Sequence, residues 1–253
     1  MVNRKRTIEY KPTRRKGTKR ASVGVPREEA RIQRLLTRAL VREPLKRGHS
    51  RVVCAELDVA SGIADVVSAV VKRKQPPDHW LSPRLLRFVN LTTAKLLAQL
   101  KRRRYLPIAT IASAAGVSRR TAKQHLKTLE RLQIAKFRDD SVMLLRSTKT
   151  HFSQVDAYEV KVSDWRHGIY QATHYRTFAN RVAVALPDKK AKAVAQNKAP
   201  FLTFGVGLVG VGSEGSLKWY IKPTRRSAAS ASKSLFSIMQ ILRTKQARAL
   251  RGF

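Results

Sequence analysis

The spacing of hydrophobic residues predicts that the N-terminal part of the chain combines a helix with β-strands. Apolar residues recur at helical intervals over 27–42, and Pro44 and Gly48 follow, which predicts an amphipathic helix. Alternating residues over 51–59 and a β-branched run over 63–71 predict a hairpin that turns at Ser61 and Gly62. From about residue 80 this α/β pattern gives way to helical spacing.

The α/β pattern returns after residue 147. Strands are predicted over 157–162 and 181–186, helices over 164–178 and 188–196, and a closing hairpin over 205–211 and 217–221. A last basic helix is predicted over 234–250. The order predicts a mixed sheet flanked by helices, in a discontinuous domain of residues 26–75 and 150–223, followed by a basic C-terminal tail over 224–253.

The intervening region predicts a helix-turn-helix. Helical spacing covers 82–104, 108–115 and 119–132, Gly116 supplies a turn, and Ser118 is placed to cap the last helix. Residues 134–145, interrupted by a polar stretch at 138–141, predict a two-stranded wing. The region 80–147 therefore resembles the winged-helix family, a likeness carried mainly by the phrase at 108–126.

That resemblance implies that the last helix lies in the DNA major groove. The residues it places on or near the exposed face of this helix are Arg119, Arg120, Lys123, Gln124 and Lys127. The neighbouring Arg102, Arg103 and Arg104 are expected either to reach phosphates or to form a solvated helix end. Winged helices also serve as protein-interaction modules, so this alternative stays open.

The net charge favours a polyanionic partner. Lys and Arg number 53 and Asp and Glu 16, giving a formal charge of +37, so nucleic acid is the leading candidate. Residues 1–25 are expected to form a flexible basic arm that contacts phosphates, or alternatively a solubility tail or localisation signal. No apolar run suits a membrane span and no signal peptide opens the chain, so we expect an intracellular, nucleic-acid-associated protein with no membrane partner.

Acidic residues are scarce, so those inside strand-like segments are informative. Glu159 and Lys161 are two residues apart in a predicted strand and share one face, and Asp65 begins another strand. Two carboxylates and an ammonium brought together could hold a divalent metal and a phosphate. Solvated strand faces or ion pairs with the many arginines are the alternative.

The element order, with Asp65, the run Glu159-Val160-Lys161 and the pair Gln171 and Tyr175, resembles the PD-(D/E)XK nuclease superfamily in its RecB-like Gln-x-x-x-Tyr form. The resemblance implies a restriction-endonuclease-like sheet in which Asp65 and Glu159 bind Mg²⁺ or Mn²⁺ and Lys161 stabilises the transition state. It also implies that Gln171 and Tyr175 position substrate or water. The chain departs from the family in its winged-helix insertion and its lack of a Pro-Asp pair.

Two residues are candidates for a further acid. Glu29 on the first helix matches an acid that such families often carry, and Glu56 in the hairpin is the alternative metal ligand. The sequence alone does not decide between Glu29 and Glu56.

These observations lead to a functional expectation with one rival. The expectation is a Mg²⁺-dependent DNA endonuclease acting on duplex or branched DNA in repair or recombination, with a homodimer left open. The rival is a non-catalytic transcriptional regulator or architectural protein that uses a nuclease-like scaffold to bind DNA.

Overall fold

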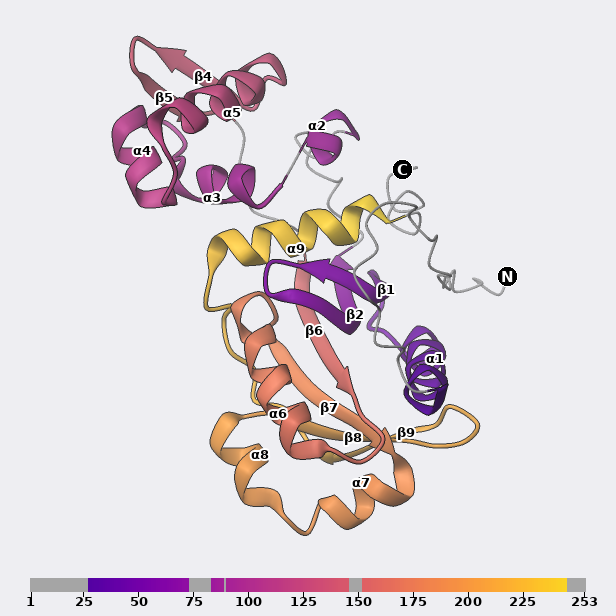
Figure 1. Ribbon diagram of the computed structural model, residues 1–253. Coiled ribbons are helices and arrows are strands. Elements are labelled where there is room, and N and C mark those ends of the chain that lie inside the picture. The colour runs from indigo at the N-terminus through magenta and orange to yellow at the C-terminus, as the bar shows by residue number, and fades with distance from the viewer. Residues whose placement is uncertain (1–26, 73–82, 89, 146–151, 245–253) are drawn as a thin grey trace, which may run out of the picture. The chain divides into compact units, whose positions relative to one another are not determined.

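The chain divides into two compact units in the computed structural model, which describes residues 27–72, 83–88, 90–145 and 152–244 (Figure 1). The first unit combines residues 1–73 with 152–229, and the second combines 74–151 with 230–253. Each unit is therefore assembled from two stretches that are far apart in sequence. The basic arm expected over 1–25 lies outside the described residues.

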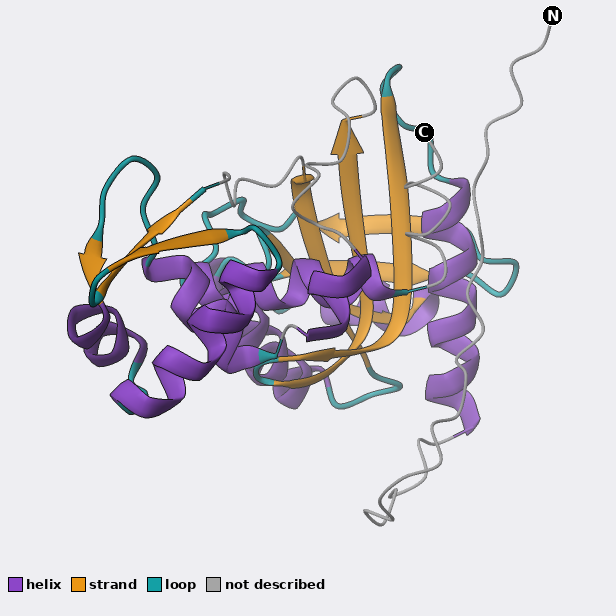
Figure 2. Cartoon of the chain, turned by 90° about the horizontal axis from the view of Figure 1, so that it is seen from above, coloured by secondary structure: helices purple, strands orange, loops and turns teal. Residues whose placement is uncertain are grey.

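A six-stranded mixed sheet forms the centre of the first unit (Figure 2). Its order is β1-β2-β6-β7-β8-β9, in which β6, β7 and β8 are parallel and the remaining pairs are antiparallel. The strands are β1 (His49–Val59), β2 (Gly62–Lys72), β6 (Phe152–Val160), β7 (Arg181–Pro187), β8 (Gly207–Val211) and β9 (Leu217–Ile221). The predicted mixed α/β class is confirmed.

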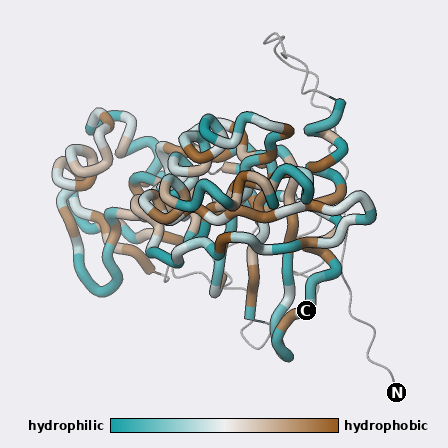
Figure 3. Tube along the Cα trace, turned by 90° about the horizontal axis from the view of Figure 1, so that it is seen from below, coloured by the Kyte–Doolittle hydropathy of each residue, from teal (hydrophilic) through white to brown (hydrophobic). Residues whose placement is uncertain are grey.

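Helices cover both faces of this sheet. α1 (Arg27–Arg42) buries Leu36 and its apolar neighbours in a cluster with Tyr158 on β6. α6 (Trp165–His174) approaches the other face so closely that a Cβ built on Gly168 would lie 3.1 Å from the Lys161 side chain. Successive strand residues point to opposite faces, so Tyr158 lies toward α1 and Glu159 toward α6. Figure 3 shows hydrophobic positions on both the helices and the strands, interspersed with hydrophilic ones.

Three helices of the first unit differ from the predicted pattern in detail. The helix expected over 164–178 ends at His174 and continues as the 3₁₀ turn η1 (Tyr175–Thr177). The helix expected over 188–196 is α7 (Asp188–Val194). The sequence pattern did not predict α8 (Lys198–Phe204), whose seven residues are too few to establish a helical period and include Pro200.

The second unit contains a helix-turn-helix with a wing. Its elements are α2 (Pro83–Phe88), α3 (Leu91–Gln99), β3 (Leu106–Pro107), α4 (Ile108–Ala115), α5 (Arg119–Arg131), β4 (Ala135–Arg138) and β5 (Ser141–Leu144). The three strands form a small sheet in the order β3-β5-β4. Gly116 ends α4 in the left-handed conformation at φ 62°, and the Ser118 side chain accepts a hydrogen bond from the Thr121 amide to cap α5. The predicted turn, cap and wing are confirmed.

One prediction for the second unit is wrong, and a second, the C-terminal helix, is confirmed with different bounds. The helix expected over 82–104 is broken because the Asn90 side chain accepts a hydrogen bond from the Thr93 amide and starts α3 as a new helix. The C-terminal helix is α9 (Ala231–Arg243) instead of 234–250, and residues 245–253 lie outside the described part. α9 packs against α2 and α3 and buries residues such as Met239, so it belongs to the core of this unit and is not a tail.

Candidate functional site

Asp65, Glu159 and Lys161 converge where β2 and β6 run side by side. The two strands pair antiparallel, with Val66 opposite Tyr158. The Asp65 Oδ2 atom accepts a hydrogen bond from the Val160 amide at 2.8 Å, although the two residues are 95 positions apart. The Lys161 Nζ atom lies 2.6 Å from Glu159 Oε1. Strand pairing thus joins the three residues that the sequence placed in separate segments.

Tyr175, in the turn that follows α6, adds a hydroxyl to this cluster. The Tyr175 hydroxyl donates to Glu159 Oε2 at 2.5 Å, so both oxygens of this carboxylate have protein partners and its side chain is 3% exposed. Gln171, four residues earlier on α6, has a buried Oε1 atom to which none of the described residues donates a hydrogen bond. An unpaired buried acceptor costs about 1–3 kcal/mol, so a water molecule or a ligand is expected to satisfy it.

The structure distinguishes between the two candidates for a further acid. Glu29 lies on α1 one turn before Gln33, whose Nε2 atom donates to the Asp65 carbonyl at 2.8 Å, and the Glu29 charge acts on the Asp65 carboxyl. Glu56 is exposed on β1 at a left-handed φ of 51°, and within the described residues no hydrogen bond or ion pair links it to the cluster. Glu29 therefore acts on Asp65 through its charge, but no hydrogen bond or ion pair among the described residues joins either Glu29 or Glu56 to the cluster.

The close approach of these groups perturbs their protonation. Burial, followed by repulsion from Glu159, raises the pKa of Asp65 to about 7, against the opposing effects of the Val160 amide and the Lys161 charge. Burial disfavours the Lys161 ammonium, but its hydrogen bond with Glu159 and the nearby acids outweigh burial and raise its pKa. Burial and the Glu159 charge raise the pKa of Tyr175, which keeps its hydroxyl proton available for donation.

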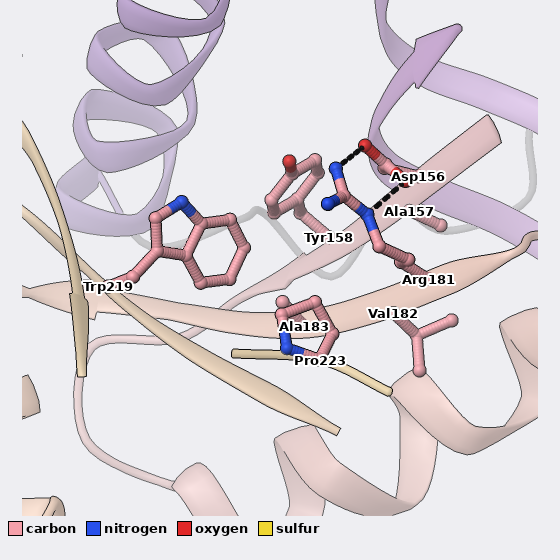
Figure 4. A pocket seen from close by; sticks show the side chains of 8 residues that line it. All are labelled: Asp156, Ala157, Tyr158, Arg181, Val182, Ala183, Trp219 and Pro223. Carbon is pink, nitrogen blue, oxygen red and sulfur yellow. Dashed lines mark hydrogen bonds and ion pairs between the residues drawn. The ribbon is translucent and has the colours of Figure 1, made fainter. Parts of the chain in front are cut away.

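The other acids near these strands have structural partners. Arg181 donates to both carboxylate oxygens of Asp156, at 2.9 and 2.6 Å, on the face that carries Tyr158 (Figure 4). The crevice beside this pair has no room for a water molecule. Asp164 caps α6 by accepting a hydrogen bond from the His167 amide. These two acids fit the alternative of ordinary structural roles.

The cluster offers oxygen ligands of the kind that Mg²⁺ prefers. Mg²⁺ is usually held through one or two carboxylates together with waters and substrate phosphates. Asp65 and Glu159 provide two carboxylates, but Lys161 and Tyr175 already occupy both oxygens of Glu159. In the described part of the chain, no group of three or more His, Cys, Asp and Glu side chains is arranged to hold a metal ion. A metal held by these two carboxylates would therefore have to displace Lys161 or Tyr175 from Glu159.

In the second unit, α5 presents the predicted DNA-contacting residues. Its exposed residues include Arg119, Arg120, Lys123, Gln124 and Lys127. The Arg119 guanidinium lies 2.6 Å from Asp140 Oδ2, in the turn between β4 and β5. Sequence reasoning missed this pair, although the acidic Asp139-Asp140 turn was a visible signal.

The arginines expected near the end of a long helix occupy a turn instead. Arg102, Arg103 and Arg104 are exposed, Lys101 and Arg104 form an isolated β-bridge, and Arg102 forms another with Leu144 of β5. Arg103 has a left-handed φ of 60°. These residues therefore lie beside the wing, in the stretch between α3 and β3.

Sequence reasoning also missed two residues that support the cluster. Gln33 holds the Asp65 backbone, and Gly168 lets α6 approach Lys161. A glycine within a helical pattern is the one signal that could have indicated such close packing. No sequence signal marked Gln33.

Residues 92–136 match a family described as an HTH domain, a stretch that runs from α3 into β4. The chain carries an HTH domain. This domain indicates DNA as a partner. Comparison with curated proteins and with solved structures gave no match. Among the helices described, none is long and apolar enough to cross a bilayer.

Proposed function

We propose that this protein is a Mg²⁺-dependent DNA endonuclease of the PD-(D/E)XK type, with its HTH domain binding the duplex. The observation that supports it is the convergence of Asp65, Glu159 and Lys161 on one face of a mixed sheet. The charge of +37 suits a large polyanionic substrate.

Each residue of the cluster has a distinct role in this proposal. Asp65 and Glu159 would hold the metal, which would supply Lewis-acid polarisation of the scissile phosphate. The Val160 amide orients Asp65, and the Tyr175 hydroxyl fixes Glu159. Lys161 provides positive charge where negative charge develops on the phosphate.

The electrostatics of the cluster support a functional interpretation. The pKa of the Asp65 carboxyl is raised to about 7, so ionising it near neutral pH lowers the stability of the folded state. Strongly perturbed groups gather at functional sites more often than elsewhere. A divalent cation would compensate the negative charge of Asp65 and Glu159. Because the chain as a whole is strongly cationic, two buried acids in one place call for a specific reason.

Cleavage assays test the proposal directly. Supercoiled plasmid, linear duplex and branched DNA are incubated with the full chain in Mg²⁺, in Mn²⁺ or in a chelator. We expect metal-dependent strand breaks, and a loss of about a thousandfold in rate for Asp65→Asn and for Lys161→Ala. Asp58→Asn is the matched control, because Asp58 is an exposed acid on β1, outside the cluster. Equal rates for Asp65→Asn and wild type would contradict the assignment.

A second candidate is a non-catalytic DNA-binding regulator, which the HTH match favours. The two candidates differ in metal binding as well as in cleavage. A metal that binds the folded state raises its melting temperature, and Mg²⁺ should do so for wild type but not for Asp65→Asn. Duplex binding without cleavage and without this Mg²⁺ effect would favour the regulator.

A further inference from the structure

A row of arginines lies along one side of α1, in the first unit. Its members follow one another at intervals of four, three, four and four residues, and all are exposed: Arg27, Arg31, Arg34, Arg38 and Arg42. At about 100° of rotation per residue, this spacing keeps the whole row within about 80° around the helix axis. We call this row the arginine stripe.

The arginine stripe faces away from the body of the first unit. The buried residues of α1 include Ile32, Leu36 and Leu40, which pack in the core cluster with the sheet. Leu36, in the middle of this buried face, is about 160° around the helix from Arg38. The apolar face of α1 therefore serves folding, and the stripe is presented to solvent.

The charge of the stripe is not balanced within the unit. Arginines three or four residues apart on a helix repel one another. The two acids of α1, Glu28 and Glu29, lie in its first turn, where they complement the helix dipole. No carboxylate in the described part of the chain forms an ion pair with Arg31, Arg34 or Arg42. A helix face that only kept the protein soluble would not need to place like charges side by side, so the stripe suits an anionic partner.

The length and the residue type of the stripe match a phosphate backbone. From Arg27 to Arg42 the helix rises about 22 Å, at about 1.5 Å per residue. One strand of B-DNA places about six phosphates over that distance. Guanidinium groups bind phosphate oxygens through two parallel hydrogen bonds, and every cation of the stripe is an arginine.

Two features favour DNA over other anionic partners. A helix that lies on a membrane inserts its apolar face among the lipids, and that face of α1 is buried against the sheet. The chain also carries an HTH domain, which indicates DNA as a partner. An acidic protein surface is the alternative.

We propose that the arginine stripe is a second DNA-contacting surface, which binds the phosphates of duplex DNA without reading their sequence. It belongs to the unit that does not contain the HTH domain, and its contribution does not depend on the proposed cleavage. Two contacts on one chain strengthen each other when both reach the same DNA molecule.

Salt-dependent binding in a chelator tests the stripe without cleavage. In the full chain, the triple variant Arg31→Gln, Arg34→Gln and Arg42→Gln removes three charges and keeps residues that favour a helix. We expect about tenfold weaker binding to duplexes of unrelated sequence. The slope of log K against log salt should fall in magnitude by about 2 to 3. Fluorescence anisotropy measures both quantities.

Two matched variants separate position from charge. Replacing Lys189, Lys190 and Lys192 of α7 with Gln removes the same charge from the same unit and should change the slope clearly less. Replacing the three α1 arginines with Lys keeps their charge and should preserve most of the slope, with weaker affinity because lysine cannot form the paired hydrogen bonds. The Gln variant of α1 loses mutual repulsion, so it should melt no lower than wild type.

The outcomes are distinct. A loss of duplex binding confined to the Gln variant of α1 supports the stripe. Binding equal to that of wild type, or equal losses for the α1 and α7 variants, would overturn the proposal. Unchanged duplex binding with a loss of binding to polyglutamate would also overturn it and favour an acidic protein partner. If wild type cut no DNA but its salt slope still depended on the stripe, the endonuclease proposal would fail while the second DNA-contacting surface stood.

Discussion

The two units of this protein arrange charge in opposite ways. The first gathers acids around one lysine in a cluster in which Glu159 is almost fully buried, whereas α5 of the second carries its cations into solvent. Burial beside Glu159 raises the pKa of Asp65, and this burial is created by neighbours from distant parts of the chain. The cluster therefore needs a tertiary environment, while the cationic surface of α5 needs only a helix.

The same difference implies separate tasks for the two units. A long-range electrostatic contact with phosphates requires exposed cations and is sensitive to salt. Metal-assisted chemistry requires carboxylates held in a fixed position. Changes to α5 should therefore alter DNA binding, and changes to the cluster should alter stability, metal binding and cleavage.

The largest expected effect is on duplex binding. It tests whether affinity depends on the position of the cations on α5 or only on the net charge of the protein. The triple variant Arg120→Ala, Lys123→Ala and Lys127→Ala should bind duplex about a hundredfold more weakly at physiological salt. The slope of log K against log salt should fall in magnitude by about 2 to 3, because up to three phosphate contacts are lost. Fluorescence anisotropy at several salt concentrations measures both quantities.

The control for this variant removes the same charge from the first unit. Lys189, Lys190 and Lys192 are exposed on α7, and replacing all three with Ala lowers the net charge equally. We expect a clearly smaller loss of duplex binding. An equal loss would mean that total charge, and not the HTH domain, determines affinity.

The next effect in size concerns the pH dependence of stability. Because the pKa of Asp65 is raised in the folded state, its stabilising contribution is full below about pH 4 and is lost as the pH rises through 7. Asp65→Asn should therefore be more stable than wild type at pH 8, on the order of 2 kcal/mol or roughly 4–8 °C in melting temperature. The difference should shrink toward pH 4.

Thermal melts followed by circular dichroism, without divalent metal, measure this difference. Asp58→Asn removes an exposed acid from the same hairpin and should show no comparable pH-dependent gain. A less stable Asp65→Asn variant at pH 8 would show that the carboxylate stabilises the fold, as expected for an ordinary structural acid.

A third effect tests the hydrogen bond that fixes Glu159. Tyr175→Phe removes the hydroxyl that donates to Glu159 Oε2 and leaves the ring in place. We expect cleavage to slow by about tenfold, from the loss of one positioning hydrogen bond, with duplex binding unchanged. Single-turnover cleavage kinetics measure the rate.

Tyr220→Phe is the matched control for that substitution. Tyr220 also donates to a carboxylate of the same unit, Asp188 Oδ1, at 3.0 Å. Its removal should leave the cleavage rate within about twofold of wild type. Similar slowing by both variants would argue that a general loss of packing, and not the cluster, causes the effect.

A weaker effect is expected from the ion pair between α5 and the wing. Asp140→Asn frees the Arg119 guanidinium, which should strengthen duplex binding by about two- to threefold, because exposed ion pairs contribute little. Asp139→Asn removes the same charge from the neighbouring position in the turn and should have a smaller effect. Weaker binding by Asp140→Asn would show that the pair orients Arg119 for DNA.

Elements whose signals are local could be predicted from the sequence alone. The bounds of α1, the turn at Gly116, the cap at Ser118 and the wing follow from helical spacing, a left-handed glycine and a capping hydroxyl. These signals act within a few residues, so the surrounding fold cannot easily override them. Local chemistry was therefore sufficient to predict the HTH domain.

The membership of the acidic cluster, in contrast, depends on how distant segments pack. On β6, alternate residues place Asp156 with Arg181 on one face and Glu159 with Tyr175 on the other. The pairing of β2 with β6 brings Asp65 to Val160, and the packing of α1 brings the Glu29 charge close enough to act on Asp65. Register and helix packing depend on contacts between segments far apart in the chain, which no local pattern encodes.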